Sequence, residues 1–390
     1  MNKDLDNKTP SCYAPWINTY EWTDGTITPC CEWNPNSPTA IKTKSHMSFE
    51  ERFNHPKMKA IKEDLLTKPI NKVPGCINCV KNEEANLWSH RDSLDALIKE
   101  DYTFDQDTFK LLHMDYRESN LCNFSCKMCG QSLSSTHAII VNQTNMYDND
   151  ESYPKDGILK NHHKLQEYLD NLDDVRLVEF LGGEPTLMNS MYIIIKEIKK
   201  RKLESNMEVS LVTNGSVIHK DQENLLEHLS GFRHVTISIS MDVAGDEHNY
   251  WRHKNTWDNV WKNTNTLHKF AQENNNTFMQ IRTALSWPTS FAARKVFELF
   301  KDLPVKHLTN LVVFPAGLSI NQLPTHLLDD LVVWWQDYPE IASIFKNTKS
   351  LTRPRILTQE KERLEQFDKY HGNSFVDTFP EFKDFYNNIG

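Results

Sequence analysis

The chain of 390 residues carries eight cysteines, a net charge of -9 and 38% hydrophobic residues. This length supports one large domain and a smaller one, and no apolar run approaches the roughly 20 residues of a membrane span. The acidic balance excludes general nucleic-acid binding, which needs a clustered basic surface. The stretch Met1–Asp6 is too polar for a secretion signal, so we expect a cytoplasmic protein without a membrane partner.

Residues 1–108 form a first region that is rich in tryptophan, proline and cysteine, with one helix expected near Phe49–Leu66. The region contains the cysteines Cys12, Cys30, Cys31, Cys76 and Cys79. In a long chain without a secretion signal, such cysteines are more typical of metal sites than of disulfides. Adjacent residues of an extended chain point in different directions, so Cys30 and Cys31 are not expected to reach the same metal.

Apolar strands alternate with amphipathic helices between residues 109 and 316. The expected strands are Leu111–Tyr116, Val175–Leu181, Glu208–Val212, His234–Ser240, Phe278–Leu285 and Leu308–Phe314. Nearly continuous apolar strands suit a parallel sheet that is buried on both faces. The sequence therefore predicts an α/β fold, a partial (β/α)6 barrel of the TIM type, with its chemistry at the carboxyl ends of the strands. Residues 317–390 are predicted to be helical, as in Leu327–Trp335, and to pack on the barrel.

The cysteines Cys122, Cys126 and Cys129 follow the first of these strands in a C-x3-C-x2-C loop. A four-iron cluster takes four ligands, so three thiolates imply either a distant fourth cysteine or a position reserved for a small molecule. Zinc binds the same soft ligands and is the alternative from the loop alone. Gly130 is expected to permit the turn into the next helix.

A Gly-Gly-Glu-Pro sequence at Gly182–Pro185 follows the second strand. Gly182 and Gly183 have no side chains that would block the approach of a ligand to their backbone, and Pro185 then fixes the chain. An ordinary strand-to-helix turn would use the same residues.

The cysteine loop followed by Gly182–Pro185 resembles the radical S-adenosylmethionine (SAM) superfamily, although this chain has Met128 where that family usually has an aromatic residue. The resemblance implies that Cys122, Cys126 and Cys129 hold a [4Fe-4S] cluster whose open iron binds the methionine part of SAM. It also implies that Gly182 and Gly183 accept hydrogen bonds from the SAM ammonium, with Glu184 as a charged partner.

The same resemblance assigns roles after the fourth strand. Ser240 matches a position that reaches the ribose hydroxyls of SAM, and Arg252 matches an arginine that clamps the methionine carboxylate. Asp242 is expected to face the substrate. Thr213–Gly215 and Thr283 are weaker candidates.

The spacing of four residues between Gly25 and Cys30 resembles the opening of SPASM and twitch modules, which carry auxiliary iron-sulfur clusters. The cysteines are too few for a full SPASM module, so the one-cluster twitch type fits better. The resemblance implies a second cluster on Cys12, Cys30, Cys76 and Cys79, with Cys31 unligated. A closed zinc site of four cysteines is the alternative.

The resulting hypothesis is an enzyme that cleaves SAM reductively to a 5'-deoxyadenosyl radical and abstracts a substrate hydrogen. A reductant such as flavodoxin or ferredoxin would supply the electron. A peptide or protein substrate is favoured by analogy with twitch and SPASM enzymes, and a nucleoside or sugar is the second choice. The alternative from another class is an iron-sulfur electron carrier or a zinc-stapled binding protein, which would not need Gly182–Pro185, Ser240 or Arg252.

Overall fold

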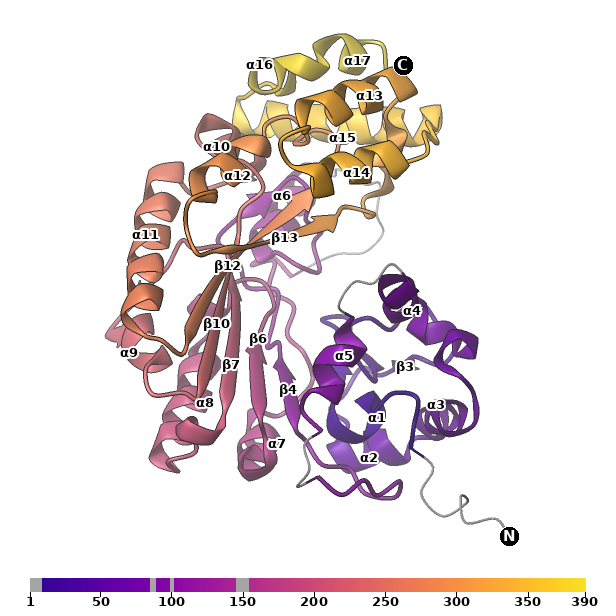
Figure 1. The fold of residues 1–390 in the computed structure, drawn as a ribbon, viewed down its shortest axis with the longest axis vertical. Helices are drawn as coiled ribbons and strands as arrows, with labels where there is room; N and C mark the ends of the chain where they lie inside the picture. Colours follow the sequence, from indigo (N-terminus) through magenta and orange to yellow (C-terminus); the bar gives the residue numbers. More distant parts are fainter. Residues whose placement is uncertain (1–8, 85–88, 99–101, 145–153) are drawn as a thin grey trace. The chain divides into compact units, whose positions relative to one another are not determined.

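A computed structural model of the chain describes residues 9–84, 89–98, 102–144 and 154–390 (Figure 1). The stretch Met1–Asp6 lies outside the described residues. The chain divides into two compact units: unit 1 comprises residues 1–119, 159–211 and 227–235, and unit 2 comprises residues 120–158, 212–226 and 236–390. Within the described ranges, no helix has the length and apolar character needed to cross a membrane.

The largest sheet contains six strands in the order β13-β12-β10-β7-β6-β4. Their bounds are β4 His113–Tyr116, β6 Leu177–Phe180, β7 Glu208–Thr213, β10 His234–Ser240, β12 Thr277–Leu285 and β13 Lys306–Leu311. β4, β6 and β7 pair in parallel, as do β12 and β13. All six predicted strands are present, and β4 and β13 stand at the two edges, so the sheet is an open one. The prediction of an α/β fold with a partial (β/α)6 barrel is confirmed.

In unit 1, the strands β4 and β6 bury apolar side chains against a helix. Tyr116 of β4 lies 5.2 Å from Tyr168 of α7 (Leu165–Asp170) and 6.4 Å from Phe180 of β6, measured between ring centroids. The amphipathic helix α8 (Asn189–Lys200) buries Ile194, Ile195 and Ile198. Because side chains alternate between the faces of a strand, the residues between these apolar ones face the opposite side of the sheet.

The N-terminal part of unit 1 combines short helices with a small antiparallel sheet, drawn in indigo to violet in Figure 1. The strands are β1 Tyr20–Glu21, β2 Thr26–Thr28 and β3 Ile41–Lys42, and the helices are α1 Ala14–Ile17, α2 Phe49–Asn54, α3 Pro56–Thr67, α4 Ile77–Glu84 and α5 His90–Asp95. The helical stretch predicted near Phe49–Leu66 is present, but it consists of two helices and not one. Pro56 lacks an amide hydrogen, so the first helix ends and a second begins at the proline, with His55 as its N-cap.

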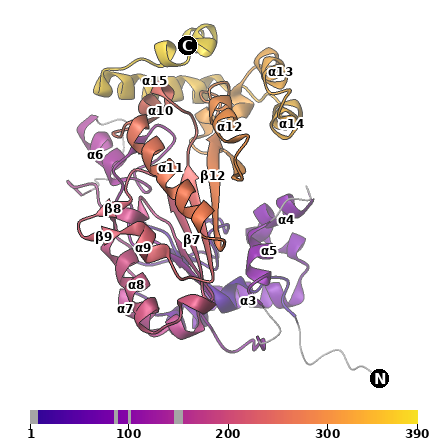
Figure 2. The ribbon, with the colours of Figure 1, turned by 60° about the vertical axis from the view of Figure 1, so that its left-hand side comes forward.

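Unit 2 contains the longest of the described helices, and Figure 2 shows α11 running beside β12. Its helices include α6 Ser135–Thr144, α10 Asp246–Trp251, α11 Trp257–Glu273, α12 Arg294–Phe300, α13 Thr325–Trp334, α14 Pro339–Asn347, α15 Pro354–His371, α16 Phe375–Thr378 and α17 Lys383–Asn387. The two-residue strand β5 (Ser125–Cys126) pairs with β11 (Arg252–His253). The chain also forms β8 His219–Lys220, β9 Glu223–Asn224 and the helix α9 Leu225–Leu229.

One apolar cluster joins the barrel part of unit 2 to the C-terminal helices. It includes Trp251 and Trp287 from the barrel part and Leu331, Phe345 and Phe382 from the C-terminal segment. Residues 317–390 are helical and pack on the barrel as predicted.

Candidate functional site

The cysteine loop of unit 2 is held by short backbone pairings. β5 and β11 run antiparallel, and Arg252 stands directly opposite Cys126 in the register. The amide of Cys129 donates to the carbonyl of Cys126 at 3.0 Å, which closes the turn between these two cysteines. Cys122 and Cys126 are buried, and Cys129 is partly exposed. The loop therefore has a defined conformation in which all three predicted ligands belong to one short segment.

The beginning of α6 fixes the first cysteine of the loop. The Ser135 hydroxyl accepts from the Cys122 amide at 3.1 Å, and the Thr136 hydroxyl donates to the Cys122 carbonyl at 2.7 Å. The Ser134 hydroxyl donates to the carbonyl of Phe124 at 2.5 Å. These side chains satisfy loop backbone groups that would otherwise be buried without partners.

Arg252 lies at the cysteine loop, but its guanidinium already has a carboxylate partner. Nε and Nη2 each lie 2.8 Å from one oxygen of Asp242, and the other oxygen accepts from the Ala284 amide at 2.8 Å. Both side chains are buried, so this is an ion pair shielded from solvent. The carboxylate of Asp242 is thus fully engaged within the protein. The charge of Arg252 also helps to lower the pKa of Cys126, after the hydrogen bond from Cys129.

Two residues that the sequence reasoning ranked low or did not consider also hold the loop. The Asn214 amide, in the Thr213–Gly215 segment after β7, donates to Oδ1 of Asn123 at 3.0 Å and lies 3.9 Å from Sγ of Cys122. Lys127, inside the loop, is fully buried and pairs with Asp368 of α15 at 3.2 Å. In the sequence, the contact of Lys127 was indicated only by the position of this lysine between two cysteines. Its partner Asp368 lies 241 residues away.

The Gly182–Pro185 segment lies in unit 1, directly after β6. Gly182 has a φ of +123°, a conformation that favours glycine, and the amide of Gly183 donates to the Ser119 carbonyl at 3.2 Å. Glu184 is completely buried, and its Oε1 accepts from the Thr186 amide and hydroxyl at 3.2 and 2.7 Å. Glu184 thus caps the turn at Pro185–Leu187. Its carboxylate therefore has a partner within the protein, in addition to the predicted partner, the SAM ammonium. Ser240 ends β10 in unit 2 and is partly buried.

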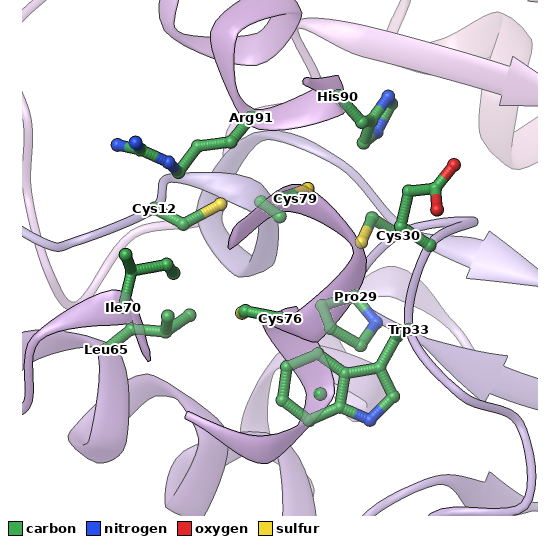
Figure 3. Close-up of a pocket in the computed structure, with 13 residues that line it drawn as sticks. Cys12, Pro29, Cys30, Trp33, Leu65, Ile70, Cys76, Cys79, His90 and Arg91 are labelled. Atoms are coloured by element: carbon green, nitrogen blue, oxygen red, sulfur yellow. The ribbon is translucent and has the colours of Figure 1, made fainter. Parts of the chain in front are cut away.

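A pocket in the N-terminal part of unit 1 gathers four cysteines from three separate segments (Figure 3). The residues around it are Cys12, Ala14, Pro29, Cys30, Glu32, Trp33, Leu65, Ile70, Gly75, Cys76, Cys79, His90 and Arg91. The space that they surround is about 360 Å³, including the part open to solvent. The structure thus brings together the four cysteines predicted as auxiliary ligands.

Cys31 does not line this pocket. Its Sγ lies 4.0 Å from Nε2 of His90. Gly25, which suggested the choice of Cys30, has a φ of +80°, and a Cβ at that position would overlap the carbonyl oxygen of Thr43. The glycine therefore permits the close turn that leads into β2 and Cys30.

The two predicted occupants of the pocket, a closed zinc site and an iron-sulfur cluster, place their ligands differently. In a closed zinc site four ligands lie about 2.0–2.3 Å from the same ion. Among the described residues, no three cysteine, histidine or carboxylate side chains are grouped closely enough for a single ion. A cubane binds its thiolates at separate irons and therefore takes them from further apart.

Burial disfavours the charged form of the pocket thiols. It raises the pKa of Cys12, Cys30 and Cys79 above the usual range and that of Cys76 to about 12. Thiolates are the form that binds metal, and a cation with several positive charges reverses this preference. The four thiols can therefore bind such a cation once they release their protons.

Comparison with known families places the cysteine loop in an enzyme superfamily. Residues 118–283 match the model described as "Radical SAM superfamily", a span that contains Cys122, Cys126, Cys129 and Gly182–Pro185. This segment matches a radical SAM domain, and the chain is an enzyme, as predicted. The match does not extend to the N-terminal cysteines or the C-terminal helices, and no curated protein matches the chain.

The solved structures with detectable likeness are remote. "Native anSMEcpe with bound AdoMet" is 17% identical over 67% of this chain and 62% of its own, with a TM-score of 0.35. Streptococcus suis SuiB bound to the precursor peptide SuiA is 15% identical over 68% and 59%, with a TM-score of 0.36. SuiB bound to S-adenosylmethionine is 16% identical over 72% and 62%, with a TM-score of 0.39. The chain thus spans about three fifths of the length of these structures.

Proposed function

We propose that the chain is a radical SAM enzyme in which Cys122, Cys126 and Cys129 bind a [4Fe-4S] cluster. The observation that carries the proposal is the family match over residues 118–283, which includes these three cysteines and Gly182–Pro185. When bound, the cluster would supply the electron that splits SAM into methionine and a 5'-deoxyadenosyl radical, with a reductant such as flavodoxin or ferredoxin as the source.

The protein's own residues would position the cofactor and the loop. We propose that the backbone of Gly182 and Gly183 binds the SAM ammonium beside Glu184, with Pro185 fixing the turn, and that Ser240 binds the ribose. The backbone pairing of Arg252 opposite Cys126 would keep the loop in place. The Arg252 guanidinium would bind the methionine carboxylate while it also pairs with Asp242. Binding the reactants at fixed positions and excluding water would be the main contribution of the protein.

The test is SAM cleavage by anaerobically reconstituted and reduced protein. We expect 5'-deoxyadenosine to form slowly even without substrate, and Cys126→Ala to abolish its formation. Leu133→Ala, a change at an exposed side chain four residues beyond the last cysteine, is the matched control and should retain the activity. If the iron-loaded, reduced wild-type protein neither binds nor cleaves SAM, the proposal is wrong.

We propose further that residues 1–108 form a twitch-like module with an auxiliary cluster on Cys12, Cys30, Cys76 and Cys79. Their arrangement around one pocket, with Cys31 outside it, supports this ligand set. A variant with Cys122, Cys126 and Cys129 all changed to Ala should retain about four irons per chain. Stoichiometric zinc without iron in that variant would instead support a structural zinc site. Iron retention in Cys30→Ala but not in Cys31→Ala would show that Cys31 is the ligand.

For the substrate we propose a peptide or protein, modified in the cytoplasm by the barrel of residues 109–316 with the helices of 317–390. The support is the resemblance of the N-terminal cysteine spacing to modules of peptide-modifying radical enzymes. A nucleoside or sugar is the competing class. The neighbouring genes would separate the two classes. If one of them encodes a short precursor peptide, that peptide should gain or lose mass on incubation with the enzyme, which would support the first class only.

A further inference from the structure

A row of polar side chains crosses three neighbouring strands of unit 1. In the parallel register, Asp115 of β4 stands opposite Glu179 of β6, and Glu179 stands opposite Ser210 of β7. Partners in register share one face of a sheet, so the three side chains lie side by side on the face opposite to Tyr116 and Phe180. The Ser210 hydroxyl donates to Oε1 of Glu179 at 3.2 Å.

Asp115 is the unusual member of this row. Its side chain is 3% exposed, and neither carboxylate oxygen has a hydrogen-bond partner among the described residues. Buried polar atoms in folded proteins nearly always have partners, so an orphaned carboxylate indicates a bound proton, water, ion or ligand group. Like charges directly opposite each other on neighbouring strands also repel, which makes the pair with Glu179 costly without a cation.

Two basic side chains of unit 1, Arg117 and His113, also lie near this row. Arg117 of the same segment lies over the ring of Tyr20, with its Cζ 5.2 Å from the ring centroid, and its Nε has no hydrogen-bond partner among the described residues. His113 lies with Nε2 3.5 Å from Oε2 of Glu179 and pairs with it when protonated. The charges of Arg117 and His113 act on Asp115, but neither group donates a hydrogen bond to its carboxylate. Burial first, and the charge of Glu179 second, raise the pKa of Asp115 to about 7.

The N-terminal part of unit 1 supplies the other wall of this site. The ring of His90 of α5 lies 5.7 Å from that of His113, and Sγ of Cys31 lies 4.0 Å from Nε2 of His90. Cys31 is thus linked to the row through His90, whose ring lies beside that of His113. Cys30 lines the cysteine pocket, whereas the printed contact of the Cys31 thiol is with His90. Glu179 remains 17% exposed, so the row is reachable from solvent.

We propose that Asp115 and Glu179 form a recognition site for a cationic N–H donor of the substrate, an ammonium or guanidinium group, with Cys31 and His90 as its N-terminal wall. The inference rests on the proposed function only in taking this group to belong to the substrate of the radical reaction. A cation between the two carboxylates would satisfy the free oxygens of Asp115 and cancel the repulsion with Glu179. In a peptide substrate, the group would be a lysine or arginine side chain or the N-terminal ammonium.

The test is the binding of small probes to the reconstituted full-length protein by titration calorimetry at pH 8. The probes are n-propylammonium and n-propylguanidinium, with n-propanol as the uncharged control. We expect the cations to bind and the alcohol not to bind. Asp115→Asn and Glu179→Gln should each weaken cation binding roughly 10- to 100-fold, the value of a hydrogen bond to a charged group. Asp173→Asn, which neutralises a carboxylate that is 72% exposed in the same unit, should leave binding unchanged.

Each outcome of this experiment decides the inference. Cation binding that is equal in the wild type and Asp115→Asn overturns it, as does binding of the alcohol as strongly as the cations. A folded Asp115→Asn protein, verified by circular dichroism, makes the loss of binding specific to the carboxylate. The readout needs neither SAM nor a reductant. A failure here therefore leaves the SAM-cleavage assay to judge the proposed function separately.

Discussion

The cysteine loop of unit 2 and the cysteine pocket of unit 1 gather the same kind of side chain in opposite ways. The loop places three thiols between residues 122 and 129, where the turn at Cys126–Cys129 and the pairing with β11 fix them. The pocket takes four thiols from segments around residues 12, 30 and 76–79, which meet only when the whole N-terminal part folds. The loop therefore depends on a few anchoring contacts, whereas the pocket depends on the packing of an entire module.

The largest expected effect comes from the buried ion pair beside the loop. Removing the carboxylate in Asp242→Ala leaves Arg252 buried without its partner, which should cost about 3–5 kcal/mol of the free energy of unfolding. Urea unfolding of the purified variant measures this cost, and Asp302→Ala, at an exposed carboxylate, is the control. A loss of less than about 1 kcal/mol would mean that solvent or another group compensates Arg252.

The second anchor of the loop is the contact between Lys127 and the C-terminal helix α15. The Asp368 carboxylate pairs with Lys127 and also accepts from the Tyr250 hydroxyl at 2.8 Å. Asp368→Ala should destabilise the protein by about 2–4 kcal/mol, because it leaves a fully buried lysine unpaired. We expect iron to be lost from the loop and retained in the pocket. Glu365→Ala, one turn earlier on the exposed side of α15, should lose neither, and equal iron contents in both variants would contradict the coupling.

A pair of glycine substitutions compares the two sites directly. A Cβ at Gly75 would overlap the ring of Trp33 in the wall of the pocket, whereas a Cβ at Gly130 after the loop meets no atom within 4 Å. Gly75→Ala should therefore cost about 1–3 kcal/mol and reduce the iron content of the pocket, as overpacking of a core does. Gly130→Ala should be tolerated in both respects. Metal analysis and thermal unfolding of the two variants decide this, and equal behaviour of both would refute the packing argument.

An effect of similar size concerns Asp115 and depends on pH. Its pKa in the folded protein is about 7, against 3.8 for an ordinary aspartate, so the folded state binds more protons than the unfolded state between these values. Stability from this group is present at low pH and is lost as the pH rises through this window. Asp115→Asn should therefore be about 1–3 kcal/mol more stable than the wild type at pH 8 and nearly equal to it at pH 4.

Urea unfolding of both proteins across this range checks the prediction. The charged and titratable groups that interact with Asp115 are Glu179, Arg117, His113, Tyr20, Cys31 and Tyr168. Glu179→Gln should reduce the same pH dependence, because the charge of Glu179 is the second cause of the raised pKa. A wild type whose stability does not fall between pH 5 and pH 8 would show that a cation from the protein already neutralises Asp115.

The sequence was most informative where structure follows from local pattern. The apolar runs predicted all six barrel strands, and His234–Ser240 matches β10 at both ends. Pro56 indicates a break between two helices, but the apolar spacing continues on either side of it and favours one helical stretch. The domain division at residues 108 and 316 stays a prediction, as do the cofactor roles of Ser240, Arg252 and Gly182–Pro185.

By itself, the sequence determined the three-cysteine loop and the Gly-Gly-Glu-Pro turn, because each is a short motif whose spacing already carries its chemistry. Only the tertiary structure decided that Asp242 neutralises Arg252, that Asp368 holds Lys127, and that the Cys31 thiol lies near His90. The physical reason is that charge pairing and burial depend on groups that meet through folding. No spacing along the chain shows which carboxylate will lie beside a buried cation and which will be left without one.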